Sequence, residues 1–167
     1  MKLLQRGGGR LVFQIGVREK SLLERIVGLY PLQPDPPASL TRNAWQPEKV
    51  SEAEVLLREA LRDQRTQLAD WAQLRMTEGE AFLRQGSGWR LVLDDQDVDR
   101  LLRVLNELRV GAWTKLGCPE QLDDEKFHAS ESDAPFHAIM TLAGQFEMVF
   151  IHSLDAEPEG GTPPAKS

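Results

Sequence analysis

The stretch GWRLVLDDQDVDRLLRVLNEL, residues 88–108, predicts a strand followed directly by a helix. Residues 89–93 form a short apolar run of β-forming side chains after a glycine. An acidic turn follows, and leucines then recur at helical spacing around the pair at 101–102. A looser version of the same order opens the chain at residues 11–29. We therefore expect two strands, each followed by a helix.

Apolar residues at helical spacing predict four helices in all. The first covers residues 18–30, the second 51–83 and the third 95–116, and the fourth starts at 135. The aspartates between 94 and 99 are explained as caps of the third helix, because acidic groups there accept hydrogen bonds from free backbone donors. This helix is apolar around so much of its circumference that we place it near the centre of a bundle. In the fourth, residues 146–151 also fit a strand.

Two strands do not form a stable sheet in isolation, so we predict that residues 10–16 pair with residues 89–93. The expected fold is α+β and predominantly helical, with about four helices packed on a small two-stranded ribbon. The glycine run at 7–9 is interpreted as too flexible to begin an element. We expect one globular domain over residues 1–153 and a disordered tail rich in Glu, Pro and Gly at 154–167.

The net charge, the cysteine content and the N-terminal residues argue against several classes of protein. The net charge of -6 argues against direct nucleic-acid binding, because a phosphate backbone repels an acidic surface. The single cysteine excludes an intramolecular disulfide and a zinc site built on several thiolates, and it fits a reducing cytoplasm. The first residues contain no apolar segment of the length of a signal peptide or membrane span, so we predict a cytoplasmic protein with no membrane contact.

No nucleophile elbow, phosphate loop or paired-histidine metal motif occurs in the sequence, so we predict no catalytic, cofactor-binding or metal-binding residues and no cofactor. His128 and His137 flank acidic residues of the 120–133 stretch, but their spacing matches no short metal motif, and a solvated acidic loop is preferred. Cys118 is the one candidate redox residue. It follows the third helix, whose negative dipole end disfavours a thiolate, so a structural or incidental role is preferred.

Two exposed-looking features, residues 29–45 and the acidic stretch at 120–133, predict contacts with another protein, and the second helix supplies further candidate residues. The second helix carries three arginines at helical neighbour spacing, which could grip an acidic partner, although nearby glutamates are placed to pair with them and favour a solvent face. Residues 29–45 place apolar groups among prolines, and a stiff segment of this kind loses little entropy on docking. The candidate interaction residues are Tyr30, Trp45, Arg58, Arg62 and Arg65.

Residues 89–109, followed by Leu116-Gly117, resemble a bacterial domain-of-unknown-function family, numbered two thousand and seventeen. Its members typically show an acidic start, a leucine pair and an Asn-acid-Leu-Arg continuation. The resemblance extends loosely over residues 10–152. It implies a cytosolic protein of similar size, in actinobacteria often encoded beside the adaptor of the Clp protease, with no established enzymatic activity. The proline-rich connection and the lone cysteine depart from the actinobacterial pattern, so a redox-regulatory role is not carried over.

We therefore predict a nonenzymatic cytosolic protein that binds another protein, as a regulatory or adaptor component. Two alternatives stay open. One is a self-contained homo-oligomer that binds a small ligand and whose wide apolar helix faces are completed by a second copy. The other is a metal-dependent enzyme that uses the acidic loop around His128 and His137.

Overall fold

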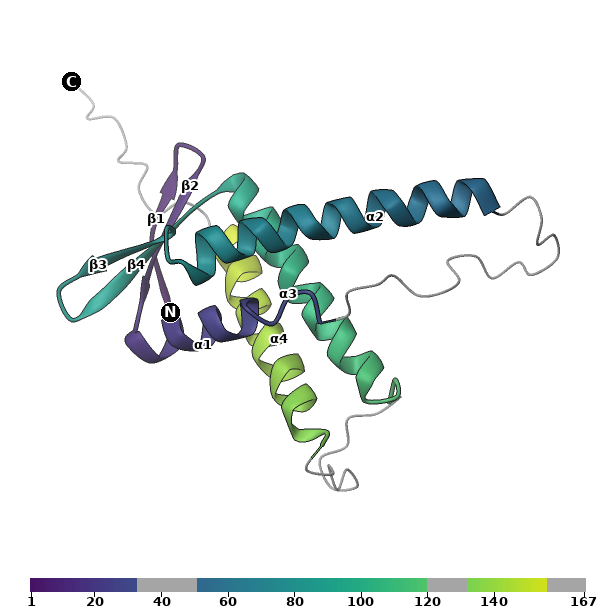
Figure 1. Ribbon diagram of the computed structural model, residues 1–167. Helices are drawn as coiled ribbons and strands as arrows, with labels where there is room; N and C mark the ends of the chain where they lie inside the picture. Colours follow the sequence, from purple (N-terminus) through teal and green to yellow (C-terminus); the bar gives the residue numbers. More distant parts are fainter. Residues whose placement is uncertain (33–50, 120–131, 156–167) are drawn as a thin grey trace.

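The computed structural model describes residues 1–32, 51–119 and 132–155, and it shows a four-stranded antiparallel sheet with helices packed on one face (Figure 1). The strand order in the sheet is β1-β2-β4-β3. The elements follow one another as β1 (Lys2–Gly7), β2 (Arg10–Ile15), α1 (Val17–Val27), α2 (Ser51–Trp71), the π-helical segment η1 (Ala72–Thr77), β3 (Phe82–Gln85), β4 (Gly88–Asp94), α3 (Asp95–Lys115) and α4 (Ala134–Asp155).

The α+β class is confirmed, but the predicted two-stranded ribbon is wrong, because β1 and β3 flank the expected pair of strands. The glycine run concealed β1. Gly8 and Gly9 have φ values of 61° and 71° and form the two-residue turn of the β1–β2 hairpin. Two successive residues with positive φ match the right-handed twist of a hairpin, and glycine adopts this conformation without steric cost. The glycines therefore join two strands instead of preceding the first.

The other missed strand, β3, occupies residues predicted to close the long second helix. That helix ends at Trp71, and η1 carries the chain to Thr77. Gly79 and Gly86 both have positive φ, at 87° and 56°. The two glycines bracket the strand, and the second sits in the tight turn that joins β3 to β4. These two glycines were the feature of the sequence that could have predicted the β3–β4 hairpin.

The predicted pairing of residues 10–16 with 89–93 is confirmed and is antiparallel. Leu11 faces Leu93 and Phe13 faces Leu91 across the two strands, and all four side chains are buried. Because side chains alternate between the faces of a strand, Ile15 is buried with Leu11 and Phe13, and the same register turns Arg10, Val12 and Gln14 away from the core. The third and fourth predicted helices are confirmed as α3 and α4, and residues 146–151 are helical.

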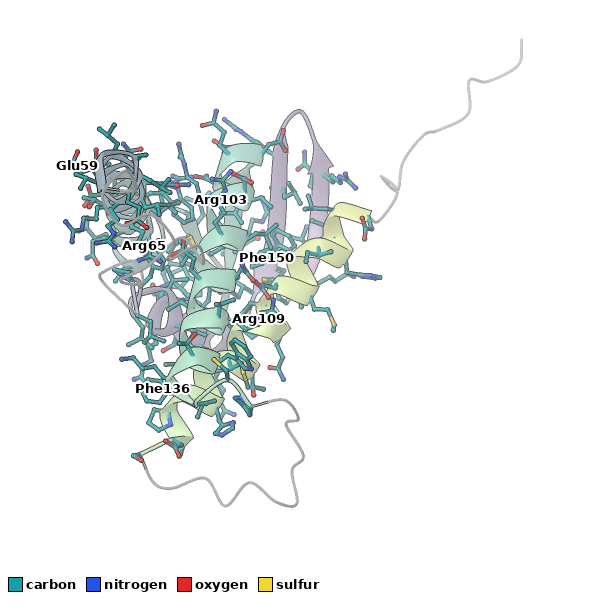
Figure 2. The ribbon with its side chains drawn as sticks, turned by 90° about the vertical axis from the view of Figure 1, so that its right-hand side faces the viewer. Glu59, Arg65, Arg103, Arg109, Phe136 and Phe150 are labelled. Atoms are coloured by element: carbon teal, nitrogen blue, oxygen red, sulfur yellow. The ribbon has the colours of Figure 1, made fainter. Side chains whose placement is uncertain are left out.

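Helices α3 and α4 lie side by side and close the core over the sheet (Figures 1 and 2). Leu101, Leu105 and Leu108 of α3 are fully buried. From α4, the ring of Phe150 packs edge to face on Phe13 of β2, with ring centroids 5.3 Å apart and planes at 88°. Aromatic pairs prefer this geometry, because the positive ring edge meets the negative ring face.

The junction between the second and third helices is built on a buried carboxylate, Asp97, which is 3% exposed. Trp71 Nε1 donates to its Oδ1 at 2.8 Å, and an Arg75 guanidinium nitrogen donates to Oδ2 at 2.6 Å. Asp94 completes the predicted cap, because its Oδ1 accepts from the Asp97 amide at 2.7 Å. Burial acts to raise the pKa of Asp97, but the hydrogen bonds from Arg75, Trp71 and Asp94 outweigh it and lower this pKa.

Beyond this junction α2 projects from the body of the protein (Figure 1), and Figure 2, which views it end-on, shows it apart from α3. None of residues 53–67 is buried. Its attachment depends on its C-terminal part, where Leu68 and Trp71 are buried and Arg65 pairs with Glu107 of α3.

We predict that Asp97→Asn destabilises the protein by about 3 kcal/mol at neutral pH, because it leaves Arg75 without its buried partner. The folded-state pKa of Asp97 is lowered, so its contribution is present above the unfolded pKa and is lost as pH falls through the folded pKa. The difference from wild type should therefore shrink below about pH 4. Urea unfolding at several pH values measures it. Asp99→Asn, two residues further along α3 and exposed, is the control and should change stability by less than about 0.5 kcal/mol. Equal losses in the two variants would contradict the account.

Candidate functional site

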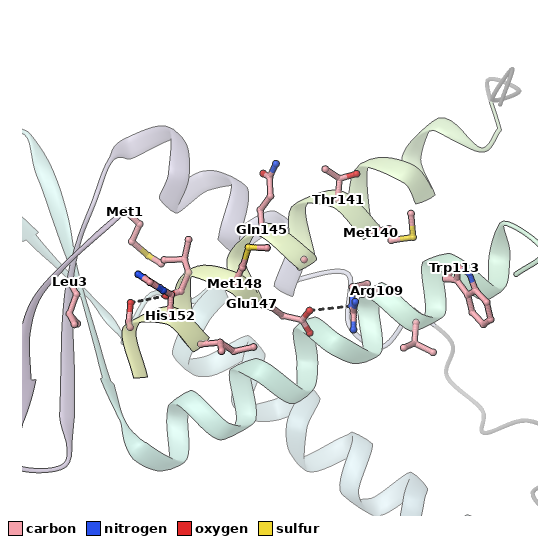
Figure 3. A pocket seen from close by; sticks show the side chains of 15 residues that line it. Met1, Leu3, Arg109, Trp113, Met140, Thr141, Gln145, Glu147, Met148 and His152 are labelled. Carbon is pink, nitrogen blue, oxygen red and sulfur yellow. Dashed lines mark hydrogen bonds and ion pairs between the residues drawn. The ribbon is translucent and has the colours of Figure 1, made fainter. Parts of the chain in front are cut away.

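An open groove of about 1470 Å³ runs along α3 and α4 and reaches the edge strand β1 (Figure 3). Helix α4 supplies most of its lining and α3 supplies one wall. Met1 and Leu3 lie at the β1 end of the groove, and Trp113 and Met140 lie toward the opposite end (Figure 3). We call this feature the α3–α4 groove.

The outward face of α4 is exposed and uncharged. Met148 is 72% exposed and Ile151 is 49% exposed. The other exposed groove residues of this helix are Thr141, Gln145, Val149 and His152. From Ala134 to Asp155 the only carboxylates are Glu147 and the terminal Asp155, and no lysine or arginine occurs. A helix facing water normally carries charged residues on its solvent side, so this face has the composition of a surface that another molecule covers.

The wall of the groove that α3 supplies also exposes apolar side chains. Val110 and Trp113 are substantially exposed beside the groove, although α3 contributes seven buried residues to the interior on its other side. Trp113 is fixed in orientation, because its Nε1 donates to the Pro119 carbonyl at 3.2 Å. The wide apolar face of this helix is therefore covered only in part by the domain itself.

One ion pair, between Arg109 and Glu147, lies among the apolar side chains of the α3–α4 groove. Arg109 Nε of α3 lies 3.2 Å from Glu147 Oε2 of α4 (Figure 3). The glutamate side chain is only 12% exposed, whereas Arg109 is about half exposed. Burial raises the pKa of Glu147, and the positive charge of Arg109 offsets part of this rise. The pair links the two helices and neutralises the only internal carboxylate of α4.

Two of the predicted interaction residues, Tyr30 and Arg65, meet elsewhere, around Glu107 of α3. The Tyr30 hydroxyl donates to Glu107 Oε2 at 3.2 Å, and Arg65 Nε lies 3.2 Å from the same oxygen. Tyr30 is buried, and burial together with the glutamate raises its pKa. A cavity of about 140 Å³ adjoins these groups. The cluster holds α1 and α2 against α3, and its geometry gives it a structural role.

The remaining sequence candidates do not meet at one place. Trp45 and His128 lie outside the described residues, as do most of the predicted acidic loop and the tail beyond Asp155. Arg58 and Arg62 lie on the projecting part of α2. Cys118 is exposed just after α3. His137 lies in the first turn of α4. Within residues 1–32, 51–119 and 132–155, no group of three or more His, Cys, Asp or Glu side chains is placed to hold a metal ion.

Among the described helices, α4 is long and apolar enough to cross a membrane by length and composition, and 17% of its most apolar window is buried. Its Phe146 and Phe150 belong to the same core as the β2 and β4 side chains. The helix is thus a packed element of the domain, and the described residues leave one of its apolar sides uncovered.

No family model, curated protein or solved structure matches this chain. The family resemblance drawn from residues 89–117 therefore stays a prediction.

The groove residues were missed by sequence reasoning, although two signals pointed to them. The helix at 134–155 is nearly free of charge, and the third helix is apolar over more of its surface than a single neighbour covers. Both patterns were interpreted mainly as core, and only the homo-oligomer alternative left wide apolar helix faces to a second copy. The groove offers apolar contacts and one internal ion pair, which suits noncovalent binding.

We predict that Glu147→Gln raises stability at neutral pH by less than about 1 kcal/mol, since Arg109 already offsets part of the cost of burial. The folded-state pKa of Glu147 is raised, so the related stability is present below the unfolded pKa and is lost as pH rises through the folded pKa. The advantage of glutamine should therefore vanish below about pH 4.3. Thermal unfolding against pH tests this, with Glu59→Gln on α2 as the control. A less stable Glu147→Gln protein at neutral pH would show that the ion pair outweighs burial.

Proposed function

We propose that this protein is a nonenzymatic protein-interaction module whose docking surface is the α3–α4 groove. The observation that carries the proposal is the exposed, uncharged outward face of α4 beside the exposed Val110 and Trp113 of α3. The occupant is an amphipathic helix of a partner chain that presents a strip of apolar side chains. Helix-in-groove recognition uses apolar side chains spaced three and four residues apart.

The shape and charge of the groove support a helix as occupant. Helix α4 has 22 residues and is therefore about 33 Å long, so a partner helix of similar length can lie along it. The strip that faces Glu147 and Arg109 must be uncharged, because these two groups already neutralise each other. A further charge buried there would lack a partner and would cost several kcal/mol, roughly 3–5.

A small-ligand site is supported less well. Pockets for small molecules are concave and have volumes of about 300–1,000 Å³, whereas this open groove of about 1470 Å³ exceeds that range. Its one carboxylate is also already paired with Arg109 and is not available to orient a small ligand. We propose a cytosolic regulatory or adaptor role on this basis, in keeping with the resemblance to the bacterial family.

A synthetic amphipathic helix with a continuous leucine and methionine face tests the proposal. Trp113 lies in the groove and reports on binding. We expect the peptide to shift its emission to shorter wavelength, measured as the difference between wild type and Trp113→Phe. Met148→Arg should weaken binding at least tenfold, which corresponds to about 1.4 kcal/mol, because it places a charge at the centre of the docking surface.

Two controls make the result specific. Leu56→Arg changes a residue that is 67% exposed on the projecting helix α2, and it should leave peptide binding unchanged. A peptide with lysine at the centre of its apolar face should bind weakly. If phosphatidylglycerol vesicles shift the Trp113 emission and the apolar peptide does not, the face meets a membrane surface instead and the proposal fails.

A further inference from the structure

The α3–α4 groove requires a helix with an exposed, uncharged apolar strip, and this protein contains such a helix. The solvent side of α2 carries Arg62 and Asp63, and that of α3 carries Asp99 and Arg103. Among the described helices, α4 alone is long and apolar with a solvent side free of lysine and arginine. The element that lines the groove therefore also has the chemistry of its occupant.

We infer that a second copy of this chain occupies the groove, so that α4 of each protomer packs on the α3–α4 face of the other. This inference rests on the proposed function and names the partner. A two-fold axis generates such an interface from one surface patch, which must be complementary to itself. The resulting assembly is a four-helix arrangement of two α3 and two α4 helices.

Charge supports self-association at this face more than at others. Each copy carries a net charge of -6, so two copies repel one another wherever their acidic surfaces meet. On the α4 face the internal carboxylate of Glu147 is neutralised by Arg109 of the same protomer, 3.2 Å away. Two such faces meet without a clash of like charges. The exposed Met148 and Ile151 then become buried.

The length of the face suits a contact between helices. Helix α4 has 22 residues and is about 33 Å long, and α3 widens the face beside Arg109, Val110 and Trp113. The pairing also covers Val110 and Trp113, the part of the wide α3 face that the domain leaves open.

Sedimentation equilibrium of the full chain over a dilution series tests the inference. We expect wild type to form a dimer of 37.6 kDa, twice the 18.8 kDa chain mass. Met148→Arg should raise the dimer dissociation constant at least 100-fold, since the two-fold axis brings two new positive charges into one interface. Met148 is exposed, so the folded monomer should tolerate the change, and circular dichroism checks this. Leu56→Arg on α2 should dimerise like wild type.

Two mixing experiments test whether the dimer contact lies at Met148 and in the groove. Met148→Arg mixed with Met148→Asp should restore a dimer, because opposite charges then meet across the axis. An excess of the apolar helix peptide should convert the wild-type dimer into a monomer–peptide complex, because both use the groove.

Each outcome decides between the two proposals. A dimer that survives Met148→Arg places the contact elsewhere and overturns the inference. A wild-type monomer at every concentration also overturns it, but peptide binding that Met148→Arg abolishes would then leave the proposed function standing. A wild-type monomer that binds no peptide contradicts both.

Discussion

The edge-to-face contact of Phe13 with Phe150 is the constraint on which the arrangement depends. It holds α4 on the sheet near its C-terminal end and determines which side of this helix is inside. Because α-helical side chains repeat every 3.6 residues, burying Phe146 and Phe150 turns Met148, Ile151 and His152 toward solvent. The apolar outer face is thus a consequence of core packing combined with a helix that contains almost no charge.

The two ends of the domain have different physical character. At the α2 junction, a buried carboxylate is fully supplied with donors from Trp71, Arg75 and a backbone amide, and the geometry there is fixed by polar contacts. At the α3–α4 groove, the surface is apolar and the single carboxylate is paired with Arg109. Directional hydrogen bonds specify one structure, whereas an uncovered apolar face favours association. The first region organises the fold, and the second is the surface that we propose for a partner.

Sequence patterns identified the elements with strong periodicity. Leucine spacing and an aspartate cap located α3. Alternation located β2 and an apolar run located β4, and their pairing was inferred because two isolated strands are not stable. Two strands were missed because glycines at 8–9 and 86 were interpreted as flexible or as helix stops, whereas hairpin turns require them. The groove was missed for a different reason. An apolar helix side that packs inside and one that awaits a partner have the same composition, and only the tertiary arrangement distinguishes them.

The most direct measurement is the rate of oxidation of individual methionines by hydroxyl radicals, followed by mass spectrometry at low and high protein concentration. Met148 is exposed on the docking face and Met76 is fully buried in the core, so Met76 is the internal reference. The account predicts that Met148 oxidises quickly in dilute protein and becomes protected as concentration rises, while Met76 stays slow throughout. Rapid oxidation of Met148 at every concentration, with and without an added apolar helix, would contradict the claim that this face is a docking surface.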